Sequence, residues 1–288
     1  MFTSLALAAA LAFAPQTPVD GGSVVSVDWV SAQPPSKRIV LLFVGPRQEY
    51  DAGHIPGTVF LPGDAIAPTG ANGLAVELPD AKALEAALEN LGVSDNSRIV
   101  LVHGRTSLPA ATRALFTLKA AGLNASLLDG GHQAWEAANR PTTQDNEQVT
   151  PGEVSPLTFK ARIVDSAYVQ SNLASPGHVV IDARDPQFYS GQQAGFGGQA
   201  KGHIKGAKSI NYRSLVKADG TLKEADDIKA AFKAAGVNEG DEVIAYCHVG
   251  QQATVLMLGA EIAGVKAVLY DGSFQDWAQK GLPVEAAQ

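Results

Sequence analysis

Residues 241–254 read DEVIAYCHVGQQAT and contain Cys247, the single cysteine of the 288-residue chain. The apolar run from Val243 to Tyr246 predicts a buried strand that ends directly before the cysteine. Apolar residues then recur at helical spacing at positions 255, 258 and 262, and Gly264 suits the end of a helix. We therefore expect Cys247 on a turn between a strand and a helix. There, backbone N–H groups and the helix dipole favour a thiolate over a thiol.

A lone cysteine can equally be a small core residue, and burial would oppose its ionisation. Cys247 follows its strand instead of lying inside it, and small or polar residues come next in the chain. The loop alone is compatible with a reactive thiolate and with a buried core cysteine, so features elsewhere in the sequence are needed to distinguish them.

Much of the sequence occurs twice. In the first half, a β-type run at 38–44 leads to an arginine, a tyrosine and Gly-His-Ile at 53–55. The second half has the same order, from a run at 178–182 to Gly-His-Ile at 202–204. In both halves a second strand, a helix, a short strand into Asp-Gly and a Trp-bearing helix follow. Strands and helices that alternate in this way predict α/β domains, each a parallel sheet with helices on both faces.

A polar, proline-containing stretch from about Pro141 to Pro156 separates the copies and has the composition of a semi-rigid linker. We assign residues 22–141 to the N-terminal domain, 142–158 to the linker and 159–285 to the C-terminal domain. A cleft between the two domains is a natural place for a ligand. His54 and His203 hold matching places in the copies, so we expect them to be structural turn residues.

The composition is that of a soluble globular protein, with 45% hydrophobic and 18% charged residues. A net charge of −7 and a pI near 5.4 argue against nucleic acid or an anionic membrane as partner.

The first residues resemble an export signal. Residues 4–14, SLALAAALAFA, form an apolar run that is too short to span a bilayer and ends in Ala-Phe-Ala. No basic residue precedes the run and Pro15 would begin the mature chain, so an ordinary N-terminal helix is the alternative. We expect residues 1–14 to be a signal peptide and the mature protein to be periplasmic or secreted. Without cleavage the protein would be cytoplasmic.

The repeat and its motifs resemble the two-domain (tandem) rhodaneses, which are thiosulfate and 3-mercaptopyruvate sulfurtransferases. The resemblance rests on the tandem copies, the Asp-x-Arg turn at 182–184, Gly-His-Ile-x-Gly in each half and a cysteine only in the second. It extends from about Val24 to Pro283. It implies two rhodanese-like domains, of which the first is inactive because His103 stands where the second has Cys247.

The resemblance also implies a reaction. The Cys247 thiolate attacks the outer sulfur of thiosulfate or 3-mercaptopyruvate, becomes a persulfide, and passes that sulfur to cyanide or a thiol. The residues implied in substrate binding are His248, Val249, Gly250, Gln251, Gln252 and Ala253 of the loop, together with Arg184 and Lys201. No metal or organic cofactor is implied, and no Cys/His spacing matches a zinc site. We expect a monomer that binds a small-molecule sulfur donor and a thiophilic acceptor. After signal cleavage we expect no association with a membrane.

The loop departs from both common family patterns, which place either cations or small Gly and Ser residues after the cysteine. Only His248 could become positive here, below about pH 6.5. The substrate arginine of the family, four residues beyond Arg184, falls at Phe188. Arg184 itself suits a structural ion pair with Asp182, which leaves Lys201 and the further cations Lys205 and Arg213. With a histidine in the loop, we expect thiosulfate ahead of 3-mercaptopyruvate as donor.

The residues around Cys247 also bear on two other function classes. Cysteine phosphatases carry an arginine six positions after the cysteine to bind phosphate, whereas this chain has Ala253 there, which argues against that class. A sulfur carrier or binding module that is loaded by a protein partner remains the alternative to the enzyme. Turnover with a small-molecule donor distinguishes the two.

Overall fold

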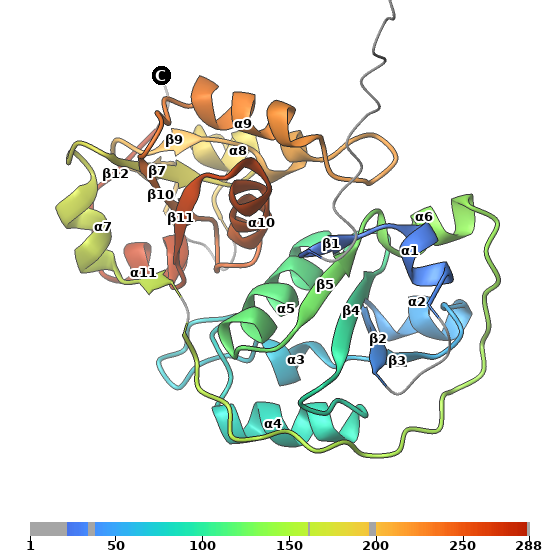
Figure 1. The fold of residues 1–288 in the computed structure, drawn as a ribbon. Helices are drawn as coiled ribbons and strands as arrows, with labels where there is room; N and C mark the ends of the chain where they lie inside the picture. The colour runs from blue at the N-terminus through green and yellow to red at the C-terminus, as the bar shows by residue number, and fades with distance from the viewer. Residues whose placement is uncertain (1–21, 34–37, 161, 196–199, 287–288) are drawn as a thin grey trace, which may run out of the picture.

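The structure is a computed structural model that describes residues 22–33, 38–160, 162–195 and 200–286. It contains two α/β domains, the first coloured blue to green and the second yellow to red (Figure 1). Each domain is built on a five-stranded parallel sheet with helices packed against it. The fold class predicted from the repeat is confirmed. The proposed signal segment, residues 1–14, lies outside the described residues.

The sheet of the first domain has the strand order β1-β5-β4-β2-β3. Its strands are β1 (Val24–Val25), β2 (Ile39–Val44), β3 (Thr58–Phe60), β4 (Arg98–His103) and β5 (Ala125–Leu128). The helices are α1 (Val27–Ser31), α2 (Arg47–Ala52), α3 (Gly63–Ile66), α4 (Ala81–Asn90), α5 (Leu108–Ala120) and α6 (Gly131–Ala137).

The sheet of the second domain has the equivalent order β6-β11-β10-β7-β9. Its strands are β6 (Ile163–Val164), β7 (His178–Asp182), β9 (Lys208–Ser209), β10 (Glu242–Tyr246) and β11 (Lys266–Tyr270). A separate antiparallel pair joins β8 (His203–Ile204) and β12 (Val284–Glu285). The helices are α7 (Ser166–Asn172), α8 (Pro186–Tyr189), the 3₁₀ turn η2 (Tyr212–Leu215), α9 (Ala225–Ala234), α10 (Ala253–Ala263) and α11 (Ser273–Gln279).

The central strand β10 contributes to two apolar cores, one on each face of its sheet. Val243, Ala245 and Cys247 join the core that includes residues of α9 and α10. Ile244 and Tyr246, which point to the opposite face, join the core that includes residues of α11. A strand buried on both faces needs the unbroken apolar run that precedes Cys247. The same alternation places Cys247 on the α10 side of the sheet.

The two copies also share a buried histidine turn. His54 stacks on Tyr50 and His203 stacks on Tyr189, each with ring centroids 3.8 Å apart. In both cases the histidine Nδ1 lies 2.8 Å from the carbonyl oxygen of that tyrosine. The repetition of this geometry in both copies agrees with the structural role expected for the two histidines.

The domains meet along α5 and α10. The hydroxyls of Thr112 and Thr254 are hydrogen-bonded at 2.8 Å, and Lys119 forms an ion pair with Glu261 at 2.7 Å. Leu258 of α10 belongs to the same apolar cluster as the core of the first domain. The first domain therefore packs directly on the helix that follows Cys247.

The connection between the domains is extended and tied to α4. The Gly152 N–H donates to the carbonyl oxygen of Glu89, and the Leu157 N–H donates to Glu85 Oε1 at 2.7 Å. These contacts suit a semi-rigid linker. The boundaries drawn from the sequence, 22–141, 142–158 and 159–285, stay predictions.

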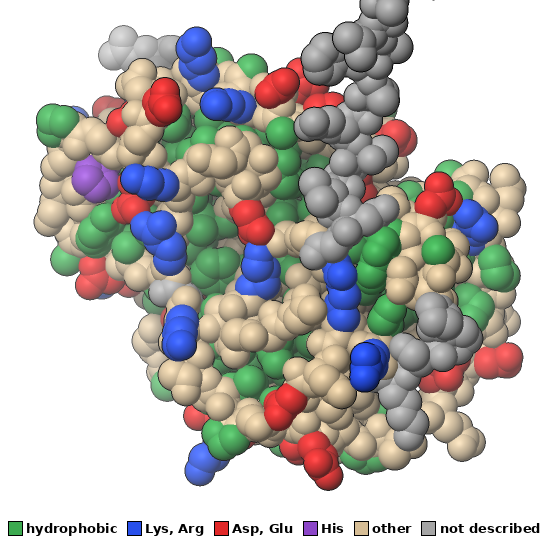
Figure 2. Space-filling model, viewed as in Figure 1, with side chains coloured by type: hydrophobic (Ala, Val, Ile, Leu, Met, Phe, Trp, Pro, Cys, Tyr) green, Lys and Arg blue, Asp and Glu red, His purple; other side chains and the backbone are tan. Residues whose placement is uncertain are grey.

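The surface in Figure 2 carries its Lys and Arg side chains dispersed over both domains and interspersed with acidic ones, instead of gathered in one patch. Such a surface offers no basic stripe on this face for a phosphate backbone. Among the described residues, no helix has both the length and the apolar character needed to cross a membrane.

Candidate active site

Cys247 directly follows β10, and its backbone is held by the start of α11. The Cys247 N–H donates to Ser273 Oγ at 3.2 Å, and its carbonyl oxygen accepts from the Phe274 N–H at 3.0 Å. The side chain is buried, with 1% of the residue exposed. The structure therefore places the cysteine at the strand-to-helix turn that the sequence predicts and fixes its position from two sides.

The loop after Cys247 presents backbone N–H groups at the start of α10. The N–H groups of Val249, Gly250 and Gln251 form no hydrogen bond with any described residue. In the first domain the equivalent loop is occupied, because Glu49 Oε2 accepts the N–H of Arg105 at 2.9 Å. The N–H group of Val249, which matches that of Arg105, is therefore available to an anion in the second loop.

Gly250 is the tightest point of the loop. Its φ of +80° lies in the left-handed region, and a Cβ there would meet the carbonyl oxygen of Asp271 at 2.7 Å and Asp271 Oδ1 at 2.8 Å. Only glycine fits both constraints. The loop thus rests directly on the Asp271 turn that follows β11.

His248 is uncharged at physiological pH. Burial, and secondarily the positive charge of Arg184, lower its pKa to about 4. Its ring lies edge-on to that of Phe188, with centroids 4.6 Å apart. His248 could therefore become positive only in more acidic solution than the pH of about 6.5 expected from sequence, because the imidazole is desolvated beside a guanidinium.

Arg184 is buried behind the loop and paired with Asp182. Its Nε and Nη2 donate to the Asp182 carboxylate at 2.6 to 3.0 Å, and Nη2 also donates to the carbonyl oxygen of Gly202 at 2.7 Å. The guanidinium lies over the Phe274 ring, 4.2 Å from its centroid. This agrees with the structural ion pair. Nη1 is buried without a partner among the described residues, so a contribution of Arg184 to substrate binding stays a prediction limited to that nitrogen.

The other residues predicted to bind substrate have fewer contacts with the Cys247 loop. Ala253 is fully buried as the first residue of α10, so only its backbone can contribute. Lys201 is exposed on an isolated bridge with Ala194, and no described contact joins it to the loop. Arg213 is paired with Asp185 at 3.2 Å. Substrate binding by Lys201 stays a prediction.

Comparison with known proteins shows the family to which the chain belongs. A model of the rhodanese-like domain family matches residues 26–138 and again residues 165–280. The chain is a two-domain member of the rhodanese family. Both matches coincide with the two α/β domains, so the tandem organisation predicted from the repeat is confirmed.

Relatives of this rhodanese are sulfurtransferases or sulfur carriers. The 3-mercaptopyruvate sulfurtransferase of Escherichia coli (strain K12) is 31% identical over 83% of this chain and 85% of its own length. Thiosulfate/3-mercaptopyruvate sulfurtransferase 2 of Arabidopsis thaliana is 27% identical, over 88% and 84%. The sulfur carrier protein TtuD of Thermus thermophilus is 26% identical, over 91% and 95%. The solved structure of EanB with a cysteine persulfide and ergothioneine has the same fold (TM-score 0.82, 21% identity, 92% of this chain and 71% of that chain).

The rhodanese site includes a tyrosine that the sequence analysis missed. Tyr212 of η2 is buried in the same apolar cluster as Cys247. Burial raises the pKa of Tyr212, and the nearby charges include Arg213 and Asp185. A signal was present in the sequence, because Gly63 holds the matching position after Gly-His-Ile in the first copy. Comparing the two halves would have singled out a tyrosine found only beside the cysteine.

The first domain supports the Cys247 loop through Arg113. This α5 side chain is completely buried and forms a two-point ion pair with Asp271, with Nη2 to Oδ2 at 3.2 Å and a shorter contact from Nη1 to Oδ1. The same Asp271 is the residue on which Gly250 rests. Nothing local marks Arg113, since it lies within an ordinary helical pattern 158 residues from its partner.

A second support comes from the loop after α3. The Gln275 side chain accepts the Ala75 N–H at 2.9 Å and donates to the carbonyl oxygen of Gly73 at 3.3 Å. Its own N–H donates to the carbonyl oxygen of His248 at 3.0 Å. Gln275 thereby connects the first domain with the residue next to the cysteine.

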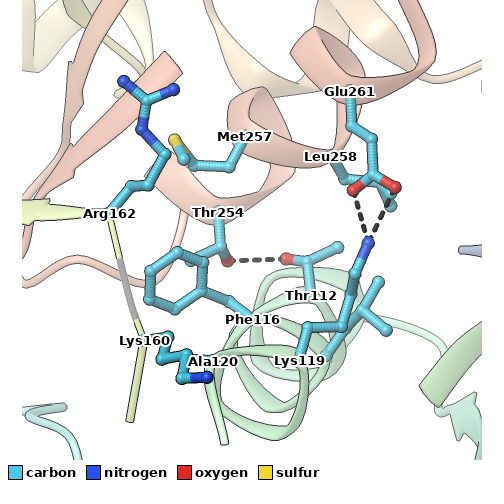
Figure 3. Close-up of a pocket in the computed structure, with 11 residues that line it drawn as sticks. Thr112, Phe116, Lys119, Ala120, Lys160, Arg162, Thr254, Met257, Leu258 and Glu261 are labelled. Carbon is cyan, nitrogen blue, oxygen red and sulfur yellow. Dashed lines mark hydrogen bonds and ion pairs between the residues drawn. The ribbon is translucent and has the colours of Figure 1, made fainter. Parts of the chain in front are cut away.

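A cavity of about 260 Å³ lies at the domain interface, between α5 and α10 (Figure 3). Its lining combines apolar Phe116 and Met257 with the charged Lys119, Lys160 and Arg162. The predicted interdomain cavity is therefore present, but its lining does not include Cys247 or residues 248–252. Among the described residues, no three His, Cys, Asp or Glu side chains cluster closely enough to hold a metal ion.

Proposed function

We propose that this chain transfers sulfane sulfur through a covalent persulfide on Cys247. One observation carries the proposal. Cys247 precedes a loop with unbonded N–H groups at 249–251, whereas the first copy has His103 at this place and a carboxylate on its loop. The membership of the rhodanese family and its sulfurtransferase relatives support the same chemistry.

The first step is an attack of the Cys247 thiolate on the outer sulfur of the donor. A new S–S bond forms at Sγ while the bond between that sulfur and the rest of the donor breaks. The bonding electron pair leaves with the donor, as sulfite from thiosulfate or as the enolate of pyruvate from 3-mercaptopyruvate. The N–H groups of residues 249–251 stabilise the negative outer sulfur of the persulfide. In the second step cyanide or a thiol removes that sulfur and restores the thiolate.

Thiosulfate and 3-mercaptopyruvate are the candidate donors that the names of the relatives suggest. In the sequence, thiosulfate is favoured only by the histidine in the loop, and a pKa of about 4 leaves His248 neutral near neutral pH. The neutral loop therefore gives no electrostatic preference for the dianion.

A sulfur carrier loaded by a protein partner is the second candidate. The uncharged loop and the similarity to TtuD, a sulfur carrier protein, favour it. A carrier needs to accept and release sulfur but does not need a built site for a small anionic donor.

Turnover separates the two candidates. Purified protein is assayed for thiocyanate formation from thiosulfate and cyanide, and for pyruvate formation from 3-mercaptopyruvate with a thiol acceptor, with Cys247→Ser as control. Multiple turnovers that vanish in the variant support the enzyme. A single sulfur per chain, with no further turnover by either donor, supports the carrier. Equal activity of the variant and the wild-type protein contradicts the role of Cys247.

A further inference from the structure

The side chain at position 188 lies over the Cys247 loop. Phe188 places its ring at 87° to the His248 ring, with centroids 4.6 Å apart. In the first domain the matching position, one residue before the stacked tyrosine, is Glu49. Its carboxylate accepts the N–H of Arg105, the residue that matches Val249. The internal repeat thus indicates that a side chain at position 188 can reach the N–H groups that would bind a donor.

The surroundings of Phe188 supply little positive charge. His248 is neutral because its pKa is lowered to about 4. The guanidinium of Arg184 is fully buried and neutralised by Asp182. Arg213 is paired with Asp185. A small dianion that entered this loop would give up its hydration with no unpaired cation among these groups to replace it, which is unfavourable.

A donor that carries an aromatic ring fits these surroundings better than a small dianion does. The rings of Phe188 and His248 form an aromatic wall to which a further ring can pack edge-on or offset, an arrangement that is favourable beyond the area it buries. A single negative charge, carried by the transferable sulfur, is within the capacity of the backbone N–H groups at 249–251.

Building on the proposed function, we propose that Phe188 sets the donor specificity of the Cys247 site by favouring a monoanionic sulfane donor with an aromatic body over the small dianion thiosulfate. Benzenethiosulfonate represents this class. The Cys247 thiolate attacks its outer sulfur, the S–S bond of the donor breaks, and the electron pair leaves with benzenesulfinate. One S–S bond replaces another, so the step needs no added oxidant or reductant.

The test measures the second-order rate of persulfide formation on Cys247 in the full chain with benzenethiosulfonate and with thiosulfate. Because the donors differ in intrinsic reactivity, the informative quantity is the change in their rate ratio between variants. We expect Phe188→Ala to lower the ratio of aromatic donor to thiosulfate about tenfold, a discrimination typical of an altered apolar contact. Phe188→Arg should lower the ratio further by raising the thiosulfate rate, since arginine binds oxyanions well. Ser171→Arg, on the exposed face of α7, controls for net charge and should leave the ratio unchanged.

A second pair of variants uses the geometry of the first domain. Phe188→Glu should slow loading by both donors at least tenfold more than Phe188→Gln, because a carboxylate there would occupy the loop as Glu49 does. Near-UV circular dichroism checks that each variant is folded. If the wild-type protein forms no persulfide with any donor, the proposed function fails. If Cys247 is loaded but the donor ratio stays within twofold in the Ala and Arg variants, or Glu and Gln behave alike, the role of Phe188 is overturned.

Discussion

At Cys247 the backbone is rigid while the loop donors stay unbonded. Ser273 and Phe274 hold the N–H and the carbonyl oxygen of the cysteine, so its own amide is not part of the anion site. The N–H groups of Val249, Gly250 and Gln251 have no partner among the described residues. Such preorganised dipoles stabilise developing charge without moving during the reaction.

Gly250 is the residue whose replacement most directly disturbs the loop. We expect Gly250→Ala to destabilise the protein by about 2 kcal/mol or more, because the new methyl group meets Asp271 and the backbone has a φ of +80°. The rate of persulfide formation should fall as well. Urea unfolding and the loading rate measure the two effects.

Gly206→Ala is the matched control. Gly206 has a similar φ of +86° but no atom within 4 Å of an added Cβ, so this variant reports backbone strain alone, about 1 kcal/mol. Equal destabilisation by the two variants would contradict the packing of Gly250 on Asp271.

The strand-to-helix turn of the second domain was predictable from sequence. The apolar run of β10 and the helical spacing in α10 determine where a polypeptide can place Cys247, and both patterns are local. The parallel sheets could be predicted as well, because strands and helices alternate in the same order in both halves of the sequence.

The supports of the loop were not predictable in this way. Arg113 and Gln275 act across the domain interface, and periodicity within one helix contains no information on how two domains dock. The lowered pKa of His248 could not be predicted for a related reason. Its pKa depends on burial beside Arg184, which only the three-dimensional arrangement reveals.

The contact between α5 and the turn after β11 should contribute strongly to stability. Arg113→Met leaves the carboxylate of Asp271 buried without its partner, which typically costs about 3–5 kcal/mol. Denaturant unfolding of Arg113→Met, Asp271→Asn and the double variant yields the coupling free energy. We expect the double variant to recover part of the loss.

The Lys119–Glu261 pair on the same two helices is the control. Both side chains are at least one-third exposed, so Lys119→Met should cost less than about 1 kcal/mol. A loss as small as this for Arg113→Met would contradict the structural role assigned to Arg113.

At the scale of the whole molecule, the first domain also contributes a titratable group, Glu77, to the interface. Burial, and then the negative charge of Asp271, raise the pKa of Glu77 to about 7. One carboxylate oxygen of Glu77 is buried without a partner among the described residues. A carboxyl group that is harder to ionise in the folded state stabilises the protein below its unfolded pKa near 4.5. That contribution is lost as the pH rises through about 7.

Melting temperatures between pH 5 and pH 8 test this effect. We expect Glu77→Gln to lose less stability than the wild-type protein over that range and to melt higher at pH 8. Glu239→Gln, at an exposed position, should follow the wild-type profile. Parallel curves for Glu77→Gln and the wild-type protein would show that Glu77 ionises in the folded state as it does in the unfolded chain.

The two copies of the fold thus have different roles. The second carries Cys247 and the loop with N–H groups at 249–251, and the first supplies Arg113 and the contacts to Gln275 that support this loop. The same division explains why the first copy can have His103 at its strand end and a carboxylate on its own loop.

An intact-mass spectrum of the full chain tests the central claim most directly. The protein is exposed briefly to thiosulfate, 3-mercaptopyruvate or benzenethiosulfonate and then to cyanide, with Cys247→Ser treated in parallel. The proposed mechanism predicts a gain of one sulfur atom that cyanide removes and that the variant never shows. A folded wild-type protein that gains no sulfur from any of the three donors, or a Cys247→Ser variant that gains it equally, would contradict the persulfide mechanism.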